Sequence, residues 1–577
     1  MRIIIRYGAL IGLAALTACE LDVQNPNDPE TERVLSTPKE AEALLGSYYK
    51  RWHAGMYGSL SNIWGMSAVM SFEDYSSLAN NCMNARAGIP RPANDNNVSN
   101  ACSTEQHRVY FYMHEVSRVA TTILHAFNQP GYSLGAPGLP ETIAQDERAK
   151  AFAQFLRGLS NGYLALVYDS ASVLLTGQGD VEAGEMSDHQ TVMDSAIAQL
   201  DAAVAHAQAA EAAGGIEIPD EWIPTNDELD MPYFEALIRS YRARFRANVA
   251  RTPAERAAVD WAAVIDDAEN GITADHDNIT DTDNGPFNTW TSQFHSYGLW
   301  HQMPPWIIGM GDTTTAYATW IAQPLEQRGT GGAFFMRTPD QRFPQGASRS
   351  AQQSDFSTTA SVANGGCNAA ATECKRYFVN RPSGNDQSAG LTWGQSNYDF
   401  VRYHSWRNRG DEGSARNGRF PFFRKAELDM LAAEGYIRQG DYASAAALIN
   451  ITRTAPMVNG RATGGGLPAV TGTADGGLSG NACVPKRPVN AGTAGGGTLV
   501  CGDLMEAMKW EKRLETSQSH FAAWFLDSRG WGDLPAGTPT HWAPPYQEMQ
   551  ARERGIYSIG TTTPGTGHVA AAGTYGW

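Results

Sequence analysis

Apolar positions recur at helical spacing along residues 420–453, and this pattern predicts two helices joined by a tight turn. One stripe of the first helix is apolar or small, namely Leu428, Leu431, Ala432, Gly435 and Tyr436. The second helix repeats the spacing at Ala445, Leu448, Ile449 and Thr452. Gly440 favours a left-handed end to the first helix, and Asp441 is well placed to cap the second. A hairpin of about 34 residues has the length of a tetratricopeptide repeat, which packs against neighbouring hairpins.

The small side chains of Gly435 and Ala445 are expected on inward faces, where two helix backbones can approach closely. The same spacing recurs upstream and predicts further helices at 38–52, 107–127, 143 to about 175, 190–210, 232–250 and 253–271. Together with 420–453, these segments make four helix pairs. A last helix is predicted at 504–526. The expected fold is therefore mostly α, with four tetratricopeptide-like hairpins forming a scaffold over about 38–271 and 420–454.

Few segments of the remaining chain have apolar residues at helical spacing. This predicts an irregular, loop-rich half packed on the scaffold. This half comprises residues 272–419, rich in Gly, Thr, Asn, Trp and Pro, and a Gly-rich insertion at 461–502. A long excursion at 53–106 interrupts the first helix pair, and loops of this length in compact domains are usually functional. We expect one domain over 38–557, with its C-terminal helix and motif region at 503–557, and a flexible tail at 558–577.

The first residues have the pattern of an export signal. Arg2 and Arg6 precede a short apolar run that ends at Ala18, too short to span a membrane. The ending Leu-Thr-Ala-Cys resembles a bacterial lipobox, which implies cleavage after residue 18 and lipid attachment to Cys19. Residues 19–37 are then a polar, acidic tether. The alternative is an ordinary signal peptide with an incidental cysteine.

The cysteine count agrees with export. Removing Cys19 from the seven cysteines leaves six, an even number that suits disulfide bonds. They form three pairs that are close in sequence, Cys82 with Cys102, Cys367 with Cys374, and Cys483 with Cys501. Six cysteines allow fifteen pairings, of which the local one is simplest because each pair encloses a polar or Gly-rich loop. The short spacings of zinc sites are absent.

Composition and charge limit the kinds of partner that this protein is expected to bind. A formal charge of −17 argues against a nucleic-acid partner and suits a neutral ligand, or merely a soluble exterior. No nucleophile elbow, phosphate-binding loop, zinc-protease or dinucleotide motif is present in the sequence, so we expect neither an enzyme nor a cofactor. The aspartates at 275, 277, 281 and 283 could form a calcium loop. However, the twelfth position counted from Asp281 is Ser292, so a solvated acidic loop is favoured.

Several short motifs resemble one family. The stretch from Ala426 to Arg453 matches its AE…AE…G-D…A…N-x-x-R repeat. Downstream matches lie at residues 510–515 (W-E-K-R-L-E), 527–532 (D-S-R-G-W-G) and 544–548 (P-P-Y-Q-E), with an upstream one at 338–342 (T-P-D-Q-R). With the lipobox and acidic tether, these motifs resemble the SusD/RagB family of surface nutrient-binding lipoproteins. One departure is the stretch 517–521 (S-Q-S-H-F), where the family has E-G-x-R.

We expect the charged motif residues Glu511, Arg513, Asp527 and Arg529 to form ion pairs that hold a partly buried helix in place. The resemblance implies a lipid-anchored protein exposed on the outer membrane that binds a nutrient, most simply an oligosaccharide. It also implies delivery to a SusC-like TonB-dependent transporter, for which the protein acts as a lid. The alternatives are a peptide-binding RagB-type protein, a structural repeat adaptor without a small ligand, and a secreted glycan hydrolase.

Aromatic residues crowd into one stretch of the irregular half, interspersed with amides and imidazoles. Flat rings can stack on a sugar while amides bind its hydroxyls. We therefore predict ligand contacts at Trp290, Tyr297, Trp300 and Trp306. By resemblance, the 53–106 excursion also lies near the family's ligand surface, which adds Trp64, Asp74, Tyr75 and Asn80. The alternative for most of these rings is that they form the core of the irregular half.

Overall fold

The computed structural model describes most of the chain after the N-terminal 34 residues. The described ranges are 35–58, 63–74, 83–175, 184–225, 228–280, 303–324, 328, 334–355, 375–380, 396–402, 418–480, 483–491, 497–560 and 567–577. The predicted signal peptide and Cys19 lie outside them. None of the helices within these ranges has the length and apolar content needed to cross a bilayer.

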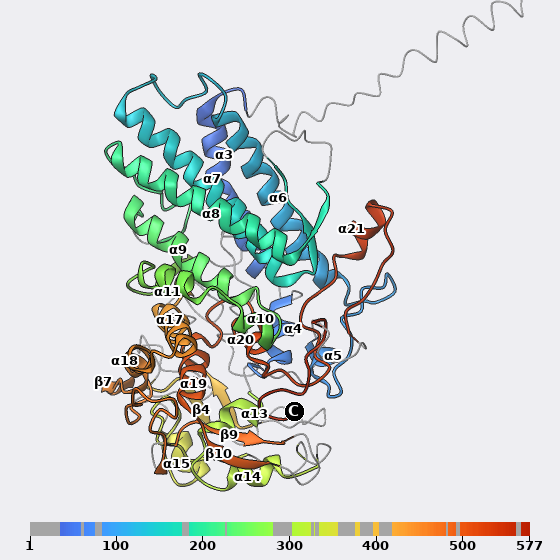
Figure 1. Cartoon of the computed structure of the whole chain (residues 1–577), viewed down its shortest axis with the longest axis vertical. Helices are drawn as coiled ribbons and strands as arrows, with labels where there is room; N and C mark the ends of the chain where they lie inside the picture. The colour runs from blue at the N-terminus through green and yellow to red at the C-terminus, as the bar shows by residue number, and fades with distance from the viewer. Residues whose placement is uncertain are drawn as a thin grey trace, which may run out of the picture.

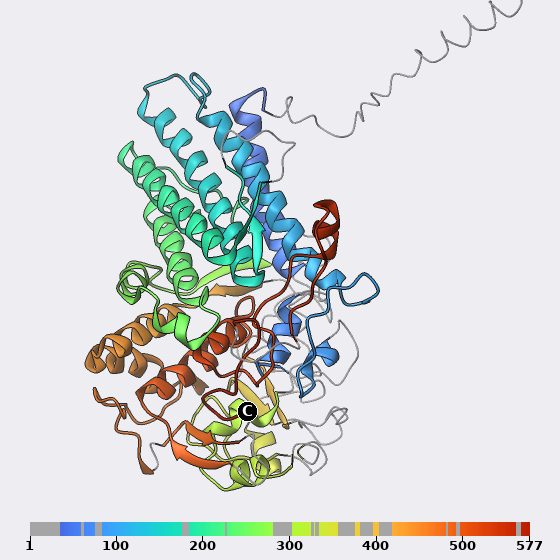
Figure 2. The ribbon, with the colours of Figure 1, turned by 45° about the vertical axis from the view of Figure 1, so that its right-hand side comes forward.

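Four long helices lie side by side in the first half of the chain (Figures 1 and 2). They are α3 (Pro38–Tyr57), α6 (Thr104–Phe127), α7 (Pro140–Val167) and α8 (His189–Ala212). Each packs against the next, α3 on α6, α6 on α7 and α7 on α8. Side-chain caps fix two of the starts, because Thr37 accepts a hydrogen bond from the amide of Glu40, and Asp188 accepts from that of Thr191.

The stack continues through α9 (Met231–Asn248), α11 (Trp261–Glu269), α17 (Lys425–Gln439) and α18 (Tyr442–Arg453). The four predicted helix pairs, α3/α6, α7/α8, α9/α11 and α17/α18, are all confirmed in the described ranges. Gly440 ends α17 with φ of 83°, and Asp441 caps α18 by accepting from the amide of Ser444, as predicted. Gly435 faces α11 rather than α18, since a Cβ there would lie 2.8 Å from Ile265 Cγ1.

Three predicted helices differ in length from the observed ones. The helix predicted to reach residue 175 ends at Val167, because the backbone of Tyr168 then pairs with Trp542. The segment 253–271 is divided into α10 (Pro253–Ala257) and α11, whose start is capped by Asp260. The last predicted helix is divided into α19 (Leu504–Thr516) and α20 (Ala523–Trp531). Positive φ angles at Gln518 and Ala522 interrupt the helical path.

Short elements complete the described part of the fold. The helical pieces are α4 (Ile63–Met70), α5 (Met83–Ala87), α13 (Pro305–Ile308), the 3₁₀ turn η2 (Gly309–Gly311), α14 (Ala316–Ile321), α15 (Arg349–Ser354) and α21 (Tyr546–Ala551). The antiparallel strand pairs are β1 (Ser170–Ser172) with β2 (Met186–Asp188), β3 (His276–Thr280) with β6 (Gly418–Phe423), β4 (Phe378–Asn380) with β5 (Tyr398–Phe400), β7 (Met457–Val458) with β8 (Arg461–Ala462), and β9 (Lys486–Val489) with β10 (Thr498–Cys501).

The Gly-rich insertion contains the β9–β10 hairpin and the predicted disulfide between Cys483 and Cys501. Cys102 is also disulfide-bonded, whereas its predicted partner Cys82 lies outside the described residues. The predicted pair Cys367 and Cys374 lies outside them as well.

The C-terminal residues are docked, and the predicted flexible tail is wrong for residues 567–577. The Tyr575 hydroxyl donates to Glu506 at 2.7 Å and accepts from Arg513 at 2.9 Å. The Trp577 indole N–H donates to the carbonyl of Asp533 at 3.0 Å. Aromatic side chains can bury large apolar surfaces, and these two end inside the core of the irregular half.

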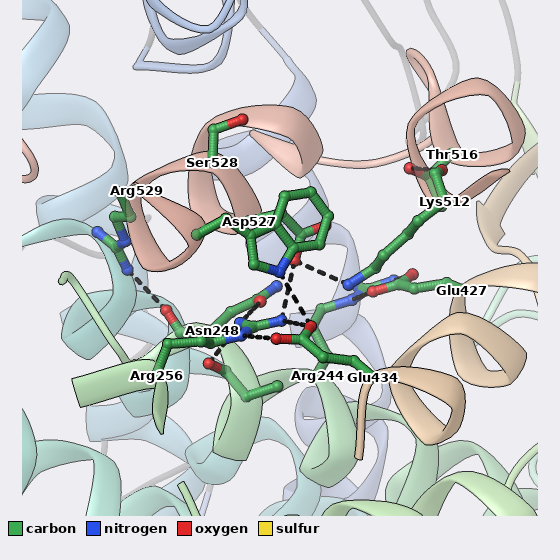
Figure 3. A network of polar contacts seen from close by, with 12 residues as sticks. Arg244, Asn248, Arg256, Glu427, Glu434, Lys512, Thr516, Asp527, Ser528 and Arg529 are labelled. Atoms are coloured by element: carbon green, nitrogen blue, oxygen red, sulfur yellow. Dashed lines mark hydrogen bonds and ion pairs between the residues drawn. The ribbon is translucent and has the colours of Figure 1, made fainter. Parts of the chain in front are cut away.

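Buried ion pairs connect the helices of the scaffold (Figure 3). Arg244 of α9 contacts Glu427 of α17 at 2.6 Å, and Arg256 of α10 contacts Glu434 of α17 at 2.6 Å. Asp527 of α20 lies 3.4 Å from Arg256. Lys512 of α19 lies 2.7 Å from Asp527. Five helices from distant parts of the sequence are therefore joined by one charged network.

A second network joins two of the quoted motifs. Arg342 contacts Glu511 of α19 and its near neighbour Asp340, each at 2.7 Å. The Trp510 indole N–H donates to Asp340 at 2.9 Å. These contacts dock the irregular half on α19 and confirm that Glu511 is structural.

The expected ion pairs are confirmed for Arg513, which contacts Asp533 at 2.5 Å, and for Asp527. Arg529 behaves differently and donates to backbone carbonyls. Its partners are the carbonyls of Leu166 and Asn248, near the C-terminal ends of α7 and α9, and that of Thr540. Helix C-termini leave such carbonyls unpaired, so the guanidinium satisfies two helix ends at once.

Two isoleucines of α18 that differ in burial allow a matched test of the core packing. Ile449 is fully buried and Ile451 is 55% exposed, although both lie on the same helix. Ile449→Ala should lower the free energy of unfolding by about 2–5 kcal/mol because it removes buried methyl groups. Ile451→Ala should change it by less than about 0.5 kcal/mol. Urea unfolding of both variants measures the difference, and equal losses would contradict the assigned packing.

The Arg244–Glu427 pair makes a second prediction. Arg244→Met leaves the Glu427 carboxylate buried without its main partner, which should cost about 3–5 kcal/mol of unfolding free energy at pH 7. Adding Glu427→Leu should recover part of this loss, as a double-mutant cycle in urea would show. Purely additive effects would show that the two charges are not coupled.

The same pair makes the free energy of unfolding depend on pH. Burial alone would raise the pKa of Glu427, but Arg244 outweighs it and lowers that pKa to about 2. The stabilisation is therefore present above the ordinary pKa of 4.5 and is lost as the pH falls towards 2.

Candidate functional site

The structure places three of the predicted ligand residues in the core. Trp64 and Asp74 are each 3% exposed, and Trp306 is 2% exposed. The Trp306 ring stacks on Phe72 with centroids 5.0 Å apart and meets Trp577 edge-on. An enclosed ring offers no free face to a sugar, so we correct the prediction for Trp64 and Trp306 and do not assign Asp74 to the site.

The other five predicted ligand residues, Tyr75, Asn80, Trp290, Tyr297 and Trp300, lie outside the described residues and stay predictions. The same holds for Asp281 and Asp283 of the acidic loop. Asp275 is bound to Arg424 at 2.6 Å. The described part of the chain holds no group of three or more His, Cys, Asp or Glu residues placed to bind a metal.

A groove of about 390 Å³ lies between α6, the segment that begins with β1, and α21. Its lining combines aromatic rings with imidazoles, an amide and charged groups. The lining residues are His107, Tyr110, Phe111, His114, Glu115, Arg118, Ser172, Leu174, Gln547, Glu548 and Arg552. We refer to this space as the α6 groove.

The first wall is one stripe of α6, because residues three and four apart share a helix face. His107, Phe111 and His114 follow this spacing, and Tyr110 precedes His114 by one turn. Phe111 is 46% exposed. Its ring stacks on His107 with centroids 5.4 Å apart and planes 27° apart, so His107 supports one side of a ring that stays partly open to the groove.

The second wall is held in place by polar contacts between distant segments. The amide of Tyr546, at the start of α21, donates to Asn96 Oδ1 at 3.0 Å. Arg552 donates to the Ser172 hydroxyl at 3.1 Å and to the carbonyl of Gly184 at 2.9 Å. These bonds fix α21 against the β1 segment and keep the groove's walls apart.

Two neutral imidazoles and one amide are among the groove's hydrogen-bonding groups. Burial lowers the pKa of both His107 and His114, although Glu548 opposes the shift at each ring. Both rings are therefore neutral at pH 7. His114 Nδ1 lies 2.9 Å from the carbonyl of Tyr110 and Nε2 lies 3.4 Å from the Ser172 hydroxyl, so its orientation is fixed.

Gln547 carries an unsatisfied acceptor. Its side-chain Oε1 is buried and has no hydrogen-bond partner among the described residues. A buried unpaired acceptor costs about 1–3 kcal/mol, so a ligand that donates a hydrogen bond to it recovers that free energy. The α6 groove thus offers a partly exposed aromatic ring, neutral imidazoles and, in Gln547, an amide whose oxygen is unpaired.

Sequence reasoning missed this groove. The pairing of His107 with Phe111 at helical spacing was visible, but every amphipathic helix shows such pairs. That Phe111 stays exposed, and that residues 547–552 face α6, depend on contacts between segments more than 400 residues apart.

The fold and groove define a helical-repeat protein with a ligand-sized site beside its first helix pair. No protein-family model matches the sequence, and the search of curated proteins also finds no match. Solved structures of SusD superfamily proteins are similar in fold.

Three such structures come from Bacteroides species. A SusD superfamily protein from Bacteroides vulgatus is 14% identical, with 87% of this chain and 89% of that chain covered and a TM-score of 0.47. A SusD homolog from Bacteroides thetaiotaomicron is 14% identical, with 96% and 94% covered and a TM-score of 0.45. A SusD-like carbohydrate-binding protein from Bacteroides fragilis is 12% identical, with 94% and 95% covered and a TM-score of 0.44. Scores this low carry no functional inference, so the assignments below rest on this chain's own residues.

Proposed function

We propose that this protein is a non-enzymatic, cell-surface nutrient-binding lipoprotein of the SusD/RagB type, and that its ligand is an oligosaccharide. The observation that carries the ligand class is the α6 groove. There the exposed Phe111 ring lines a concave space together with Gln547, whose Oε1 is unpaired among the described residues.

A sugar suits these two features together. The apolar face of a pyranose ring can stack on Phe111, and aromatic packing contributes roughly 0.5–1.5 kcal/mol beyond area burial. A ring hydroxyl can donate to Gln547, while the neutral ring of His107 exchanges hydrogen bonds with a second hydroxyl. A flat ring that carries hydroxyl donors at its edge can stack on one wall of the groove and donate hydrogen bonds to the other.

The surface location and the partner follow from the sequence motifs. Cys19 at the end of the lipobox would carry the lipid, and residues 19–34 would span from the membrane to the start of the described scaffold at Leu35. A scaffold joined by buried ion pairs can move as a rigid body, as a lid over a SusC-like TonB-dependent transporter must. Tyr75, Asn80, Trp290, Tyr297 and Trp300 remain proposed as additional ligand contacts.

Binding to a panel of oligosaccharides and peptides tests the ligand class. Phe111→Ala should weaken the best glycan about tenfold, because it removes the stacking face. Gln547→Leu should weaken it about fivefold by removing the acceptor. The matched control is Leu139→Ala, a 45% exposed apolar residue outside the groove, which should bind as the wild type does.

Each other outcome of the panel identifies a different function. Saturable binding of peptides alone would favour the RagB-type cargo. Absence of any saturable ligand would favour the structural adaptor, and release of shortened glycan would show a hydrolase. Unchanged affinity in both groove variants would place the ligand elsewhere.

Purification from solubilised outer membranes tests the partner. The wild type should co-purify with a TonB-dependent transporter, and Phe111→Ala should do so equally, since the ligand groove is not the proposed docking face. Recovery without any transporter would contradict the lid role. Cys19→Ser should abolish incorporation of labelled fatty acid, and retained labelling would contradict lipidation at Cys19.

A further inference from the structure

Two turns that are distant in sequence meet at a fully buried carboxyl group. The first turn, residues 71–74, follows α4, and the second, residues 517–522, joins α19 to α20. The Glu73 side chain has no exposed surface. Its Oε1 accepts a hydrogen bond of 2.7 Å from the amide of Gln518. The backbone amide of Trp524 also points to the carboxyl and favours its ionised form, although burial outweighs both amides. Oε2 has no partner at normal hydrogen-bond geometry among the described residues.

The first turn is strained. The amides of Phe72 and Glu73 donate to the carbonyls of Val69 and Ala68, a helix ending that usually has glycine at its left-handed position. Here Phe72 occupies that position with φ of 65°. Stacking of the Phe72 ring on Trp306 offsets the backbone cost, which is about 1–3 kcal/mol for such a residue.

The second turn is also strained and has unpaired polar groups. Gln518 and Ala522 have φ of 52° and 56°. The Ser517 hydroxyl, both polar atoms of the Gln518 side chain and His520 Nδ1 are buried without hydrogen-bond partners among the described residues. Such groups would regain hydrogen bonds if water entered the junction, which lowers the free-energy cost of opening it.

The charges around Glu73 do not neutralise it. Asp527 of α20 faces it with the same sign, and Lys512 of α19 is bonded to Asp527 at 2.7 Å. Burial holds the His520 ring neutral by lowering its pKa to about 3. Arg91 lies over the Phe72 ring and donates to the carbonyls of Met70, Arg86 and Ala87 rather than to Glu73.

We propose that Glu73 is a proton-operated latch: its protonated carboxyl holds the turn after α4 against the turn between α19 and α20, and ionisation releases this junction. The protonated acid is uncharged, so it tolerates burial and still accepts the hydrogen bond from Gln518. A buried carboxylate is costly unless a cation pairs with it, and the described residues of the junction place no cation at Oε2.

The direction in which pH changes the opening equilibrium follows from the raised pKa of Glu73. Burial, the largest cause, raises the pKa of Glu73 from 4.5 to about 8. The open junction exposes the carboxyl to water and restores its ordinary value. The opening equilibrium should therefore rise about tenfold per pH unit between about pH 5 and 7.5 and level off above pH 8. The junction is closed most firmly in mild acid.

The test is hydrogen exchange followed by mass spectrometry on the full protein between pH 5 and 9. Rates are corrected for the intrinsic pH dependence of amide exchange. Peptides from residues 63–74 and 517–522 should lose protection as the pH rises to about 8, whereas α8 peptides should not. Glu73→Gln keeps the shape of the protonated acid and should make the protection of both turns independent of pH.

Two results would overturn the latch. One is wild-type protection in these turns that stays constant from pH 5 to 9, a readout that needs no variant. The other is a Glu73→Gln protein that loses protection with the same pH profile as the wild type. Thermal midpoints give a second readout, because the wild type should lose stability relative to Glu73→Gln as the pH rises from 5 to 8. This inference is independent of the ligand in the α6 groove, so the two proposals fail separately.

Discussion

The arrangement of the scaffold depends on arginine–carboxylate pairs enclosed between helices. Arg256 reaches from α10 to Glu434 of α17 and, through Asp527, to α20, while Arg244 joins α9 to the same α17. Removing these charges from water costs several kcal/mol for each ion, which only close pairing repays. The pairs therefore contribute less to net stability than to specificity, because a shift of α17 by one residue would leave an unpaired charge in the core.

The irregular half is attached by the same kind of contact. Arg342 sits among Asp340, Glu511 and Glu515, and so ties a loop to α19. The C-terminal segment adds Tyr575, whose hydroxyl joins Arg513 to Glu506. With few long elements of its own, this half takes its position from polar contacts with α19, and the strained junction at Glu73 lies at the end of that helix.

The groove beside α6 shows why the binding site was less predictable than the fold. An indole or a phenyl ring in an irregular sequence can fill a core or line a site, and composition does not separate the two roles. Trp306 fills the core, where it stacks on Phe72, whereas Phe111 of a regular helix stays exposed. Gln547 lies beside that helix because bonds to Asn96 and to Ser172 of β1 hold α21 in place.

The sequence by itself determined the helices, their pairing and their caps, because spacing of apolar residues and residues such as Gly440 and Asp441 act locally. It also indicated that Glu511, Arg513 and Asp527 hold the structure together. The tertiary structure alone decided that Arg529 serves helix ends, that residues 567–577 are docked, and that Phe111 faces Gln547. The burial of a side chain, an unpaired acceptor and the left-handed backbone at Phe72 each depend on residues that are distant in sequence. A local sequence pattern therefore cannot predict them.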